Sequence, residues 1–310
     1  MDCKELLEIS CSTLKTLGEL GCESGKNCEN IKVPLIFPTK REKKVRISEQ
    51  ELRLLFIEKW KEKNDEKNND NKKYYSIETP TKYIYSLKKT DEGQSDKDQF
   101  QSASIDMSIF KCDNKKFKRE LNIEFKHNHE KKSIEKDILK LLCEDQDGVF
   151  IVLLNNTTNN TTKKTLSSVY GKIFNFLDYK NIENARVKLV NEDQISCEIA
   201  EPKDIKSHLN KDKKIHIVVM SLQSSKSRNC ESSKDLYLIY HQINFSENSK
   251  QNLGWYLEKN IEEVYDDCVK QNSICCENKL NECECYKVKI ESKKEEIPFI
   301  IEHCCVCKVT

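Results

Sequence analysis

The chain has no apolar run long enough to cross a membrane. Its first residues, Met1-Asp2-Cys3-Lys4-Glu5, lack the basic and then apolar stretches of a signal peptide. The net charge is only +1, so no overall basic field attracts nucleic acid, and any surface that binds it must be local. The sequence contains no P-loop, helicase motif, sequence-reading helix or internal repeat. We expect a cytoplasmic protein that does not enter membranes.

Glycine and proline are scarce, with 7 and 5 residues, whereas lysine, asparagine and isoleucine are frequent, as in proteins from AT-rich genomes. Charged residues make up 34% of the 310 residues, but blocks of charge alternate with apolar runs, which indicates a loop-rich globular protein rather than a disordered one. The 16 cysteines would indicate disulfides in a small secreted protein. Without a secretory signal, we expect mostly reduced thiols or metal ligands.

Apolar periodicity predicts alternating helices and strands. Helical spacing predicts helices over residues 4–20, from the capping box at 48–51, from about 133, over 165–179 and over 255–264. Alternating or continuous apolar runs predict strands at 74–79, 82–87, 104–109, 121–126, 149–154, 188–190, 215–222 and 236–245. This order predicts an α/β fold with one mixed central sheet flanked by helices. We divide the chain into an N-terminal helical extension, a main domain and a cysteine-rich C-terminal tail, at 1–44, 45–265 and 266–310.

Two of the predicted strands carry charged residues between apolar ones. In the first, Asp106 alternates with aliphatic residues, and in the second Glu124 and Lys126 do the same. Because side chains of a strand alternate between the two faces, the aliphatic residues can enter a core while the charged ones point the other way. If the strands are neighbours, two carboxylates and an ammonium group converge on one surface.

That combination can hydrolyse a phosphodiester bond with the help of a divalent ion. Mg²⁺ prefers hard oxygen ligands and keeps several waters, so two carboxylates and a carbonyl suffice. We expect Asp106, Glu124 and the backbone carbonyl of Phe125 to bind Mg²⁺, or Mn²⁺ in its place. Lys126 would orient or deprotonate the attacking water, or stabilise charge on the phosphate.

The Glu-x-Lys pattern alone is weak in so charged a chain, since it recurs at five other places. Glu124 differs because it lies inside an alternating strand that follows another strand with an acid on its polar face. The alternative is a sheet with one solvated face, on which charged residues have no chemical role.

The acid on one strand followed by acid-x-Lys on the next resembles the PD-(D/E)XK nuclease superfamily, whose members have the restriction-endonuclease-like fold. Ile105 stands where the proline of that motif would be. The resemblance covers about residues 45–155 and extends toward 245. It implies a metal-dependent nuclease in which an acid on the first helix completes the metal shell. Glu51 is the first choice and Glu49 the second, although Glu51 can instead close the capping box with Ser48.

Basic residues near these strands are candidates for contact with a nucleic-acid backbone. The loop between the strands holds four of them, and the following helix adds another. They are Lys115, Lys116, Lys118, Arg119 and Lys136. The alternative is that these side chains are simply solvated.

The cysteine-rich tail carries two pairs of cysteines at short spacing. They are Cys283 and Cys285, then Cys304 and Cys307. Structural Zn²⁺ usually takes two such pairs, although Cys-x-Cys is tighter than most zinc sites use. A tail of reduced thiols is the alternative.

The sequence therefore predicts a metal-dependent nuclease that acts on nucleic acid, DNA being favoured. The habits of the superfamily suggest host defence or mobile-element biology, as a homodimer or with a targeting partner. Two alternatives stay open. One is a catalytically inert subunit of the same fold that binds nucleic acid or acts as a scaffold, and the other is a zinc-binding interaction module in the tail.

Overall fold

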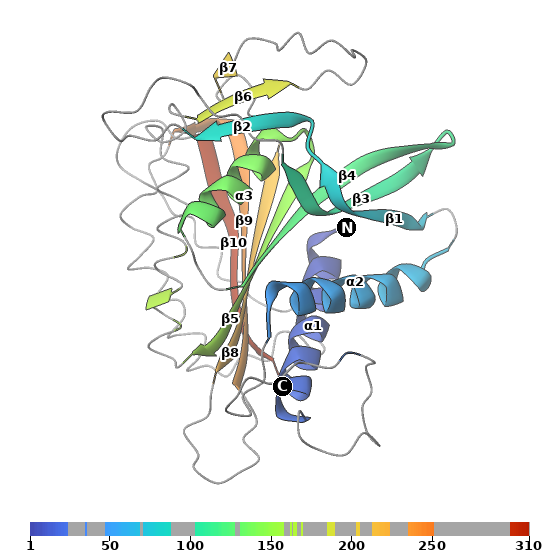
Figure 1. Cartoon of the computed structure of the whole chain (residues 1–310), viewed down its shortest axis with the longest axis vertical. Helices are drawn as coiled ribbons and strands as arrows, with labels where there is room; N and C mark the ends of the chain where they lie inside the picture. Colours follow the sequence, from blue (N-terminus) through green and yellow to red (C-terminus); the bar gives the residue numbers. More distant parts are fainter. Residues whose placement is uncertain are drawn as a thin grey trace.

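A computed structural model describes residues 1–23, 35, 47–68, 71–87, 103–127, 131–157, 162, 164–165, 169, 185–189, 203–204, 213–223, 235–250 and 298–309. Within them a seven-stranded sheet forms the centre of an α/β fold (Figure 1). Its order is β1 (Lys73–Pro80), β3 (Ser104–Asp113), β4 (Lys116–His127), β5 (Asp147–Thr157), β8 (Lys214–Gln223), β9 (Asp235–Lys250) and β10 (Pro298–Val309). The predicted mixed sheet is confirmed, because β4, β5 and β8 are parallel and the other neighbours are antiparallel.

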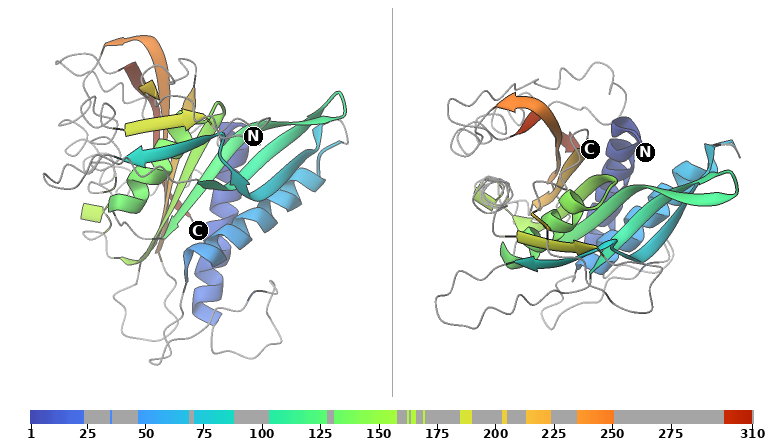
Figure 2. Two further views of the ribbon diagram at one scale, coloured as in Figure 1. Left: turned by 45° about the horizontal axis from the view of Figure 1, so that its top comes forward. Right: turned by 90° about the horizontal axis from the view of Figure 1, so that it is seen from above.

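Three helices accompany the sheet: α1 (Cys3–Glu23), α2 (Glu49–Asp65) and α3 (Lys131–Cys143). As Figures 1 and 2 show, α1 and α2 lie together on one side of the sheet and α3 on the other. Strands β4 and β5 are parallel, so the chain must cross over between them, and α3 forms this crossover. A smaller sheet follows the order β2 (Tyr83–Leu87), β6 (Ala185–Leu189), β7 (Lys203–Asp204). Across the described helices, none combines the length and apolar character of a membrane span.

Helix α1, which lies in the predicted N-terminal helical extension, shares the hydrophobic core of the sheet. Leu6 and Leu14 are buried in one cluster with Phe56 of α2, Phe125 of β4 and residues of β8 and β9. The Phe56 and Phe125 rings meet edge to face, with centroids 5.3 Å apart. A Cβ added at Gly18 would lie 3.0 Å from the Leu236 methyl carbons, so the first helix packs tightly on β9.

The end of the chain also joins this sheet. Strand β10 pairs antiparallel with β9, with Val309 opposite Leu236. Residues 298–309 of the predicted cysteine-rich tail therefore form the last strand of the sheet. The rest of that segment, the predicted helix at 255–264 and nearly all of the one at 165–179 lie outside the described residues.

Lys213, the residue before β8, is a buried cation that contacts the C-terminal end of α3. Its side chain, 2% exposed, donates hydrogen bonds to the carbonyl oxygens of Leu142 and Glu144. The two carbonyls belong to the last turn of α3 and the residue after it, so the ammonium group caps this end of the helix. Burial lowers the pKa of Lys213 to about 8, although Cys143 and nearby carboxylates oppose this effect.

This lowered pKa predicts how stability depends on pH. Between pH 8 and 10 the unfolded chain keeps the Lys213 proton that the folded protein has lost, so the free energy of unfolding should rise with pH. Relative to Lys213→Met, wild-type protein should gain roughly 2 kcal/mol over that range. Urea unfolding of both proteins at several pH values measures the difference. A difference that stays flat would mean that Lys213 keeps an ordinary pKa.

Candidate active site

The register of β3 and β4 brings the predicted acids together. Met107 and Ile123 are the last pair of the β3–β4 ladder at the end away from the hairpin. Asp106 and Glu124 are the next residue along each strand beyond this pair. Asp106 Oδ2 accepts a hydrogen bond of 2.8 Å from the Phe125 N–H, so a carboxylate bonds the neighbouring strand where the ladder ends. The two acids thus meet at one place on adjacent strands, as the sequence predicted.

Helix α3 adds an acid and a cation to this pair. Lys140 Nζ lies 2.6 Å from Glu124 Oε1, 2.9 Å from Asp137 Oδ1 and 2.9 Å from the carbonyl oxygen of Ser104. Asp137 and Lys140 are three residues apart, which places them on one face of the helix. We call Asp106, Glu124, Lys126, Asp137 and Lys140 the acid–lysine cluster.

Lys126 lies on the open side of the cluster. Its Nζ is 2.9 Å from Asp137 Oδ2 and 3.5 Å from Glu49 Oε2, and its side chain is 17% exposed. Burial would lower the pKa of Lys126, but the carboxylates of Asp137, Glu49 and Asp106 outweigh it and raise the pKa above its ordinary value. Lys126 therefore remains an ammonium group, which suits charge stabilisation better than proton abstraction.

Glu124 is the most enclosed member, with 1% of its surface exposed. Burial raises its pKa well above the ordinary value, and the carboxylates of Asp137 and Asp106 add to this effect, while Lys140 opposes it. Glu124 Oε1 lies 2.6 Å from the Lys140 ammonium group, and Asp137 Oδ2 lies 2.9 Å from that of Lys126. Each of these buried carboxylates is thus compensated by a lysine of the cluster.

The first turn of α2 settles the choice between Glu51 and Glu49 in geometry. The Glu51 carboxylate accepts hydrogen bonds from the backbone and hydroxyl of Ser48, at 2.7 Å for the backbone bond, and so forms the predicted capping box. Glu49 instead faces Lys126. Burial and the nearby Asp106 raise the pKa of Glu49, which Lys126 opposes. Of the two acids, Glu49, the second choice, is the one that contacts the cluster, through Lys126.

This difference predicts separable effects of two substitutions. Glu51→Ala should lower the free energy of unfolding by about 1 kcal/mol, because it removes a helix cap, and leave activity nearly unchanged. Glu49→Ala should lower activity with little loss of stability, since its side chain is 34% exposed. Thermal unfolding and the rate of DNA cleavage, measured on both variants, test the assignment. Loss of activity in the Glu51 variant alone would reverse it.

Three charged residues in or beside the cluster, Arg53, Asp137 and Lys140, were not predicted as site residues from the sequence. Arg53 Nη1 lies 3.4 Å from Asp106 Oδ1 and also pairs with Glu78 of β1. Arg53 follows Glu49 by one helical turn, so both face the cluster. Asp137 and Lys140 had a visible signal, since they share the polar side of the predicted helix, but only the contact with Glu124 gives them a role.

The predicted nucleic-acid contacts fall into two groups. Lys115, Lys116 and Lys118 are exposed on the hairpin that joins β3 to β4. Arg119 instead has partners within the fold. Its Nη1 lies 3.3 Å from Glu144 Oε2, and its Nη2 donates a hydrogen bond of 3.0 Å to the carbonyl oxygen of Pro80. Lys136 lies on α3, one residue before Asp137.

The donor set of the cluster fits Mg²⁺ or Mn²⁺ in its chemistry. Two carboxylate oxygens and a carbonyl oxygen already surround one cation, the Lys140 ammonium group, and such hard oxygens are the ligands these ions prefer. In the described part of the chain, no group of three or more His, Cys, Asp or Glu side chains is arranged to hold a metal. The carbonyl of Phe125 stays a predicted ligand. The predicted zinc-binding cysteines lie outside the described side chains.

Comparisons of the chain with protein-family models, curated proteins and solved structures found no match. Any assignment of function must therefore come from the geometry of the acid–lysine cluster and of the surfaces around it. The cluster combines paired acids on adjacent strands, a lysine two residues from one of them and a second lysine from the following helix. Such a set of groups can bind a cation and compensate charge on an anionic substrate.

Proposed function

We propose that this protein is a metal-dependent nuclease that hydrolyses phosphodiester bonds, with DNA as the favoured substrate. The observation that carries the proposal is the meeting of Asp106 and Glu124 on adjacent strands, with Lys126 beside them. Charged residues of a merely solvated sheet face would be expected to point into water. Instead, Glu124 is buried and Asp106 bonds the backbone of the neighbouring strand.

The order of elements supports this proposal. Helix α2, the antiparallel strands β1, β3 and β4, helix α3 and the parallel strand β5 follow one another around the cluster. This is the order expected of a restriction-endonuclease-like domain, with the acids on the second and third strands. The short β2 inserts between the first two strands of this series and joins the smaller sheet.

Asp106 and Glu124 would hold the divalent ion, and Asp137 lies beside Glu124 through their shared contact with Lys140. A bound ion of this kind supplies a nucleophile at neutral pH and neutralises charge on the phosphate. The chain itself orients these ligands: Phe125 N–H fixes Asp106, and Lys140 holds Glu124 beside Asp137. Arg53 restrains the second oxygen of Asp106.

Lys126 would stabilise the negative charge that develops on the phosphate during cleavage. It is partly exposed, and Glu49 beside it is more so, which makes this side the entrance for a substrate. Glu49 holds the Lys126 ammonium group from the entrance, and Asp137 holds it from the interior. A cation held at two points loses little freedom when it meets a phosphate.

A second candidate function is a binding or scaffold subunit of the same fold without catalysis. The observation in its favour is that Lys140 already neutralises Glu124 and Asp137. In such a protein the Lys140 ammonium group permanently occupies the position that a metal ion would take. The two candidates differ in one property, which is whether a divalent ion can enter the cluster.

Incubation of the purified chain with plasmid, linear duplex and single-stranded DNA tests the proposal, with Mg²⁺, Mn²⁺ or EDTA present. We expect cleavage with either ion and none in EDTA. The same assay with Asp106→Ala guards against a contaminating nuclease. DNA binding without cleavage under every condition would favour the scaffold candidate.

A further inference from the structure

Exposed aromatic rings gather at the end of the sheet where the β3–β4 hairpin projects. Phe117 of β4 is 64% exposed and Tyr74 of β1 is 48% exposed. Their rings meet edge to face with centroids 4.9 Å apart. Figure 1 shows this hairpin, with β1 beside its base, extending beyond the helices. Two large rings held together in solvent bury little surface within the fold, which invites a ligand.

These two rings lie on the same face of the sheet as the acid–lysine cluster. Tyr74 is opposite Phe110 and Phe117 is opposite Cys112, and residues opposite one another in a ladder share a face. Along β3, Phe110 and Cys112 are four and six residues from Asp106, so they too share its face. The rings are therefore roughly 13 to 20 Å from Asp106 along the strand.

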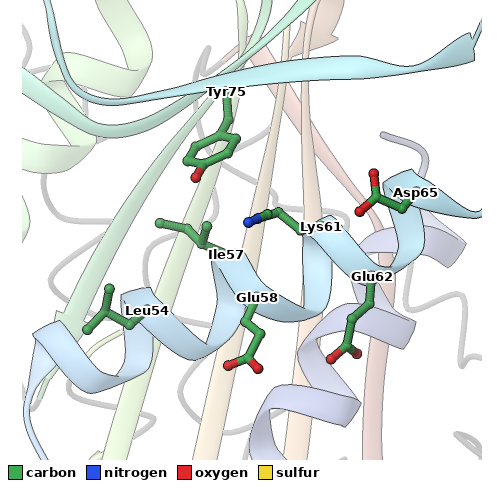
Figure 3. A pocket seen from close by; sticks show the side chains of 7 residues that line it. All are labelled: Leu54, Ile57, Glu58, Lys61, Glu62, Asp65 and Tyr75. Carbon is green, nitrogen blue, oxygen red and sulfur yellow. The ribbon is translucent and has the colours of Figure 1, made fainter. Parts of the chain in front are cut away.

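The other face of β1 is unsuited to a polyanion. There a groove between β1 and α2 is lined by Tyr75 and by Glu58, Glu62 and Asp65, with Lys61 as its one lining cation (Figure 3). Three carboxylates would repel phosphate groups. The apolar residues of β1 thus face two different environments, and only the Tyr74 face leads toward the cluster.

The hairpin beside the rings is basic. Lys115 is exposed at the turn, next to the exposed acid Asp113. Lys116 and Lys118 are also exposed, but they alternate with Phe117 along β4 and so project from the other face of the hairpin. Lysine ammonium groups next to aromatic rings form the usual binding surface for a single strand, because the bases stack on the rings while the cations track the phosphates. A duplex offers its phosphates but not its base faces, so the rings favour a single strand.

The geometry points to Tyr74 and Phe117 as a base-stacking platform that binds single-stranded nucleic acid and leads it along the sheet face to the acid–lysine cluster. This inference rests on the proposed function and narrows its substrate to DNA with single-stranded segments. Lys115, at the turn of the hairpin, would bind the backbone of the same segment without reading its sequence.

Fluorescence anisotropy in EDTA tests the platform without any catalytic step. The probes are a fluorescein-labelled oligo(dT) of 20 nucleotides and a duplex of the same length. Each ring is expected to contribute about fivefold or more to single-strand affinity, since base stacking on one aromatic side chain contributes roughly 1–3 kcal/mol. Tyr74→Ala/Phe117→Ala should therefore lose at least about 25-fold for oligo(dT) and change little for the duplex.

Ile77→Ala provides the matched control, because Ile77 is on the same strand, is 54% exposed and points to the opposite face. It should bind both probes like the wild type. The platform would be overturned if the double variant bound oligo(dT) as tightly as the wild type does. It would also be overturned if the wild-type protein bound the duplex more tightly than oligo(dT). Sedimentation of the double variant adds a further check: if it merely converts a dimer to a monomer, the rings form a self-association surface and the inference fails.

Cleavage measured on the same proteins separates this inference from the proposed function. Stacking-dependent binding without cleavage in Mg²⁺ would support the platform and reject the nuclease. Metal-dependent cleavage that is insensitive to removal of both rings would support the nuclease and reject the platform.

Discussion

Asp106→Ala, Glu124→Gln and Lys126→Ala are each expected to lower Mg²⁺-dependent DNA cleavage by about a thousandfold or more. Metal and charge stabilisation supply several kcal/mol to phosphodiester hydrolysis, and each 1.4 kcal/mol changes the rate tenfold. Because the three groups act as one unit, the double and triple variants should be hardly worse than the single ones. Initial rates of plasmid nicking measure the effect.

Glu124 requires glutamine rather than alanine in this experiment. Alanine would leave the ammonium group of Lys140 buried without its closest partner, and loss of one member of a buried ion pair destabilises proteins by about 3–5 kcal/mol. Glu62→Gln is the matched surface control, since its side chain is 55% exposed and distant in sequence from the cluster. Wild-type cleavage by Lys126→Ala would mean that this lysine has no chemical role.

Binding separates the roles of the three residues. The two acid variants should lose affinity for the metal, whereas Lys126→Ala should keep it and lose only the chemical step. In EDTA, Asp106→Ala should bind DNA at least as tightly as the wild type, because removal of a carboxylate removes repulsion of the phosphates. Calorimetric titration with Mn²⁺ and anisotropy with DNA give these two affinities.

Lys140→Met is expected to lower the free energy of unfolding in EDTA by about 3–5 kcal/mol and to make stability depend strongly on Mg²⁺. Without the ammonium group, the buried Glu124 carboxylate loses its cation and lies beside that of Asp137, which keeps only Lys126 as its partner. A divalent ion can then take its position among the three oxygens. Any ligand that binds only the folded state stabilises it, so Mg²⁺ should restore much of the loss.

Urea unfolding of Lys140→Met and wild type, each with EDTA and with Mg²⁺, measures this response. Lys136→Met is the control on the same helix, where a partly exposed lysine should contribute less than about 1 kcal/mol. Equal responses of both variants to Mg²⁺ would show that the oxygens around Lys140 do not accept a metal. The scaffold candidate predicts that result.

The strands that carry the site could be predicted because their alternation is local. Ile105, Met107 and Ile109 are all fully buried, and their spacing alone places Asp106 on the other face. The capping box at Ser48 is equally local, since its partners are three residues apart. Neither pattern depends on where the rest of the chain lies.

The partners of these strands could not be predicted in the same way. Nothing within α3 says that Lys140 reaches Glu124, because that contact depends on the crossover bringing α3 back over β4. The pattern of β10 was also hidden, since cysteines in 298–309 resemble metal ligands more than a sheet strand. Glu49 and Glu51 are both acids in the first turn of α2, and only the observed contacts, Glu51 with Ser48 and Glu49 with Lys126, distinguished them.

The packing of α1 on β9 has a consequence for how the chain folds. Leu236, which contacts Gly18, is synthesised long after the first helix has left the ribosome. Until then the apolar side of α1 has no complete surface on which to pack, and contacts between such distant residues form slowly. During synthesis α2 can cover part of this helix, but the side that meets β9 stays uncovered, so docking on β9 should be among the last steps of folding.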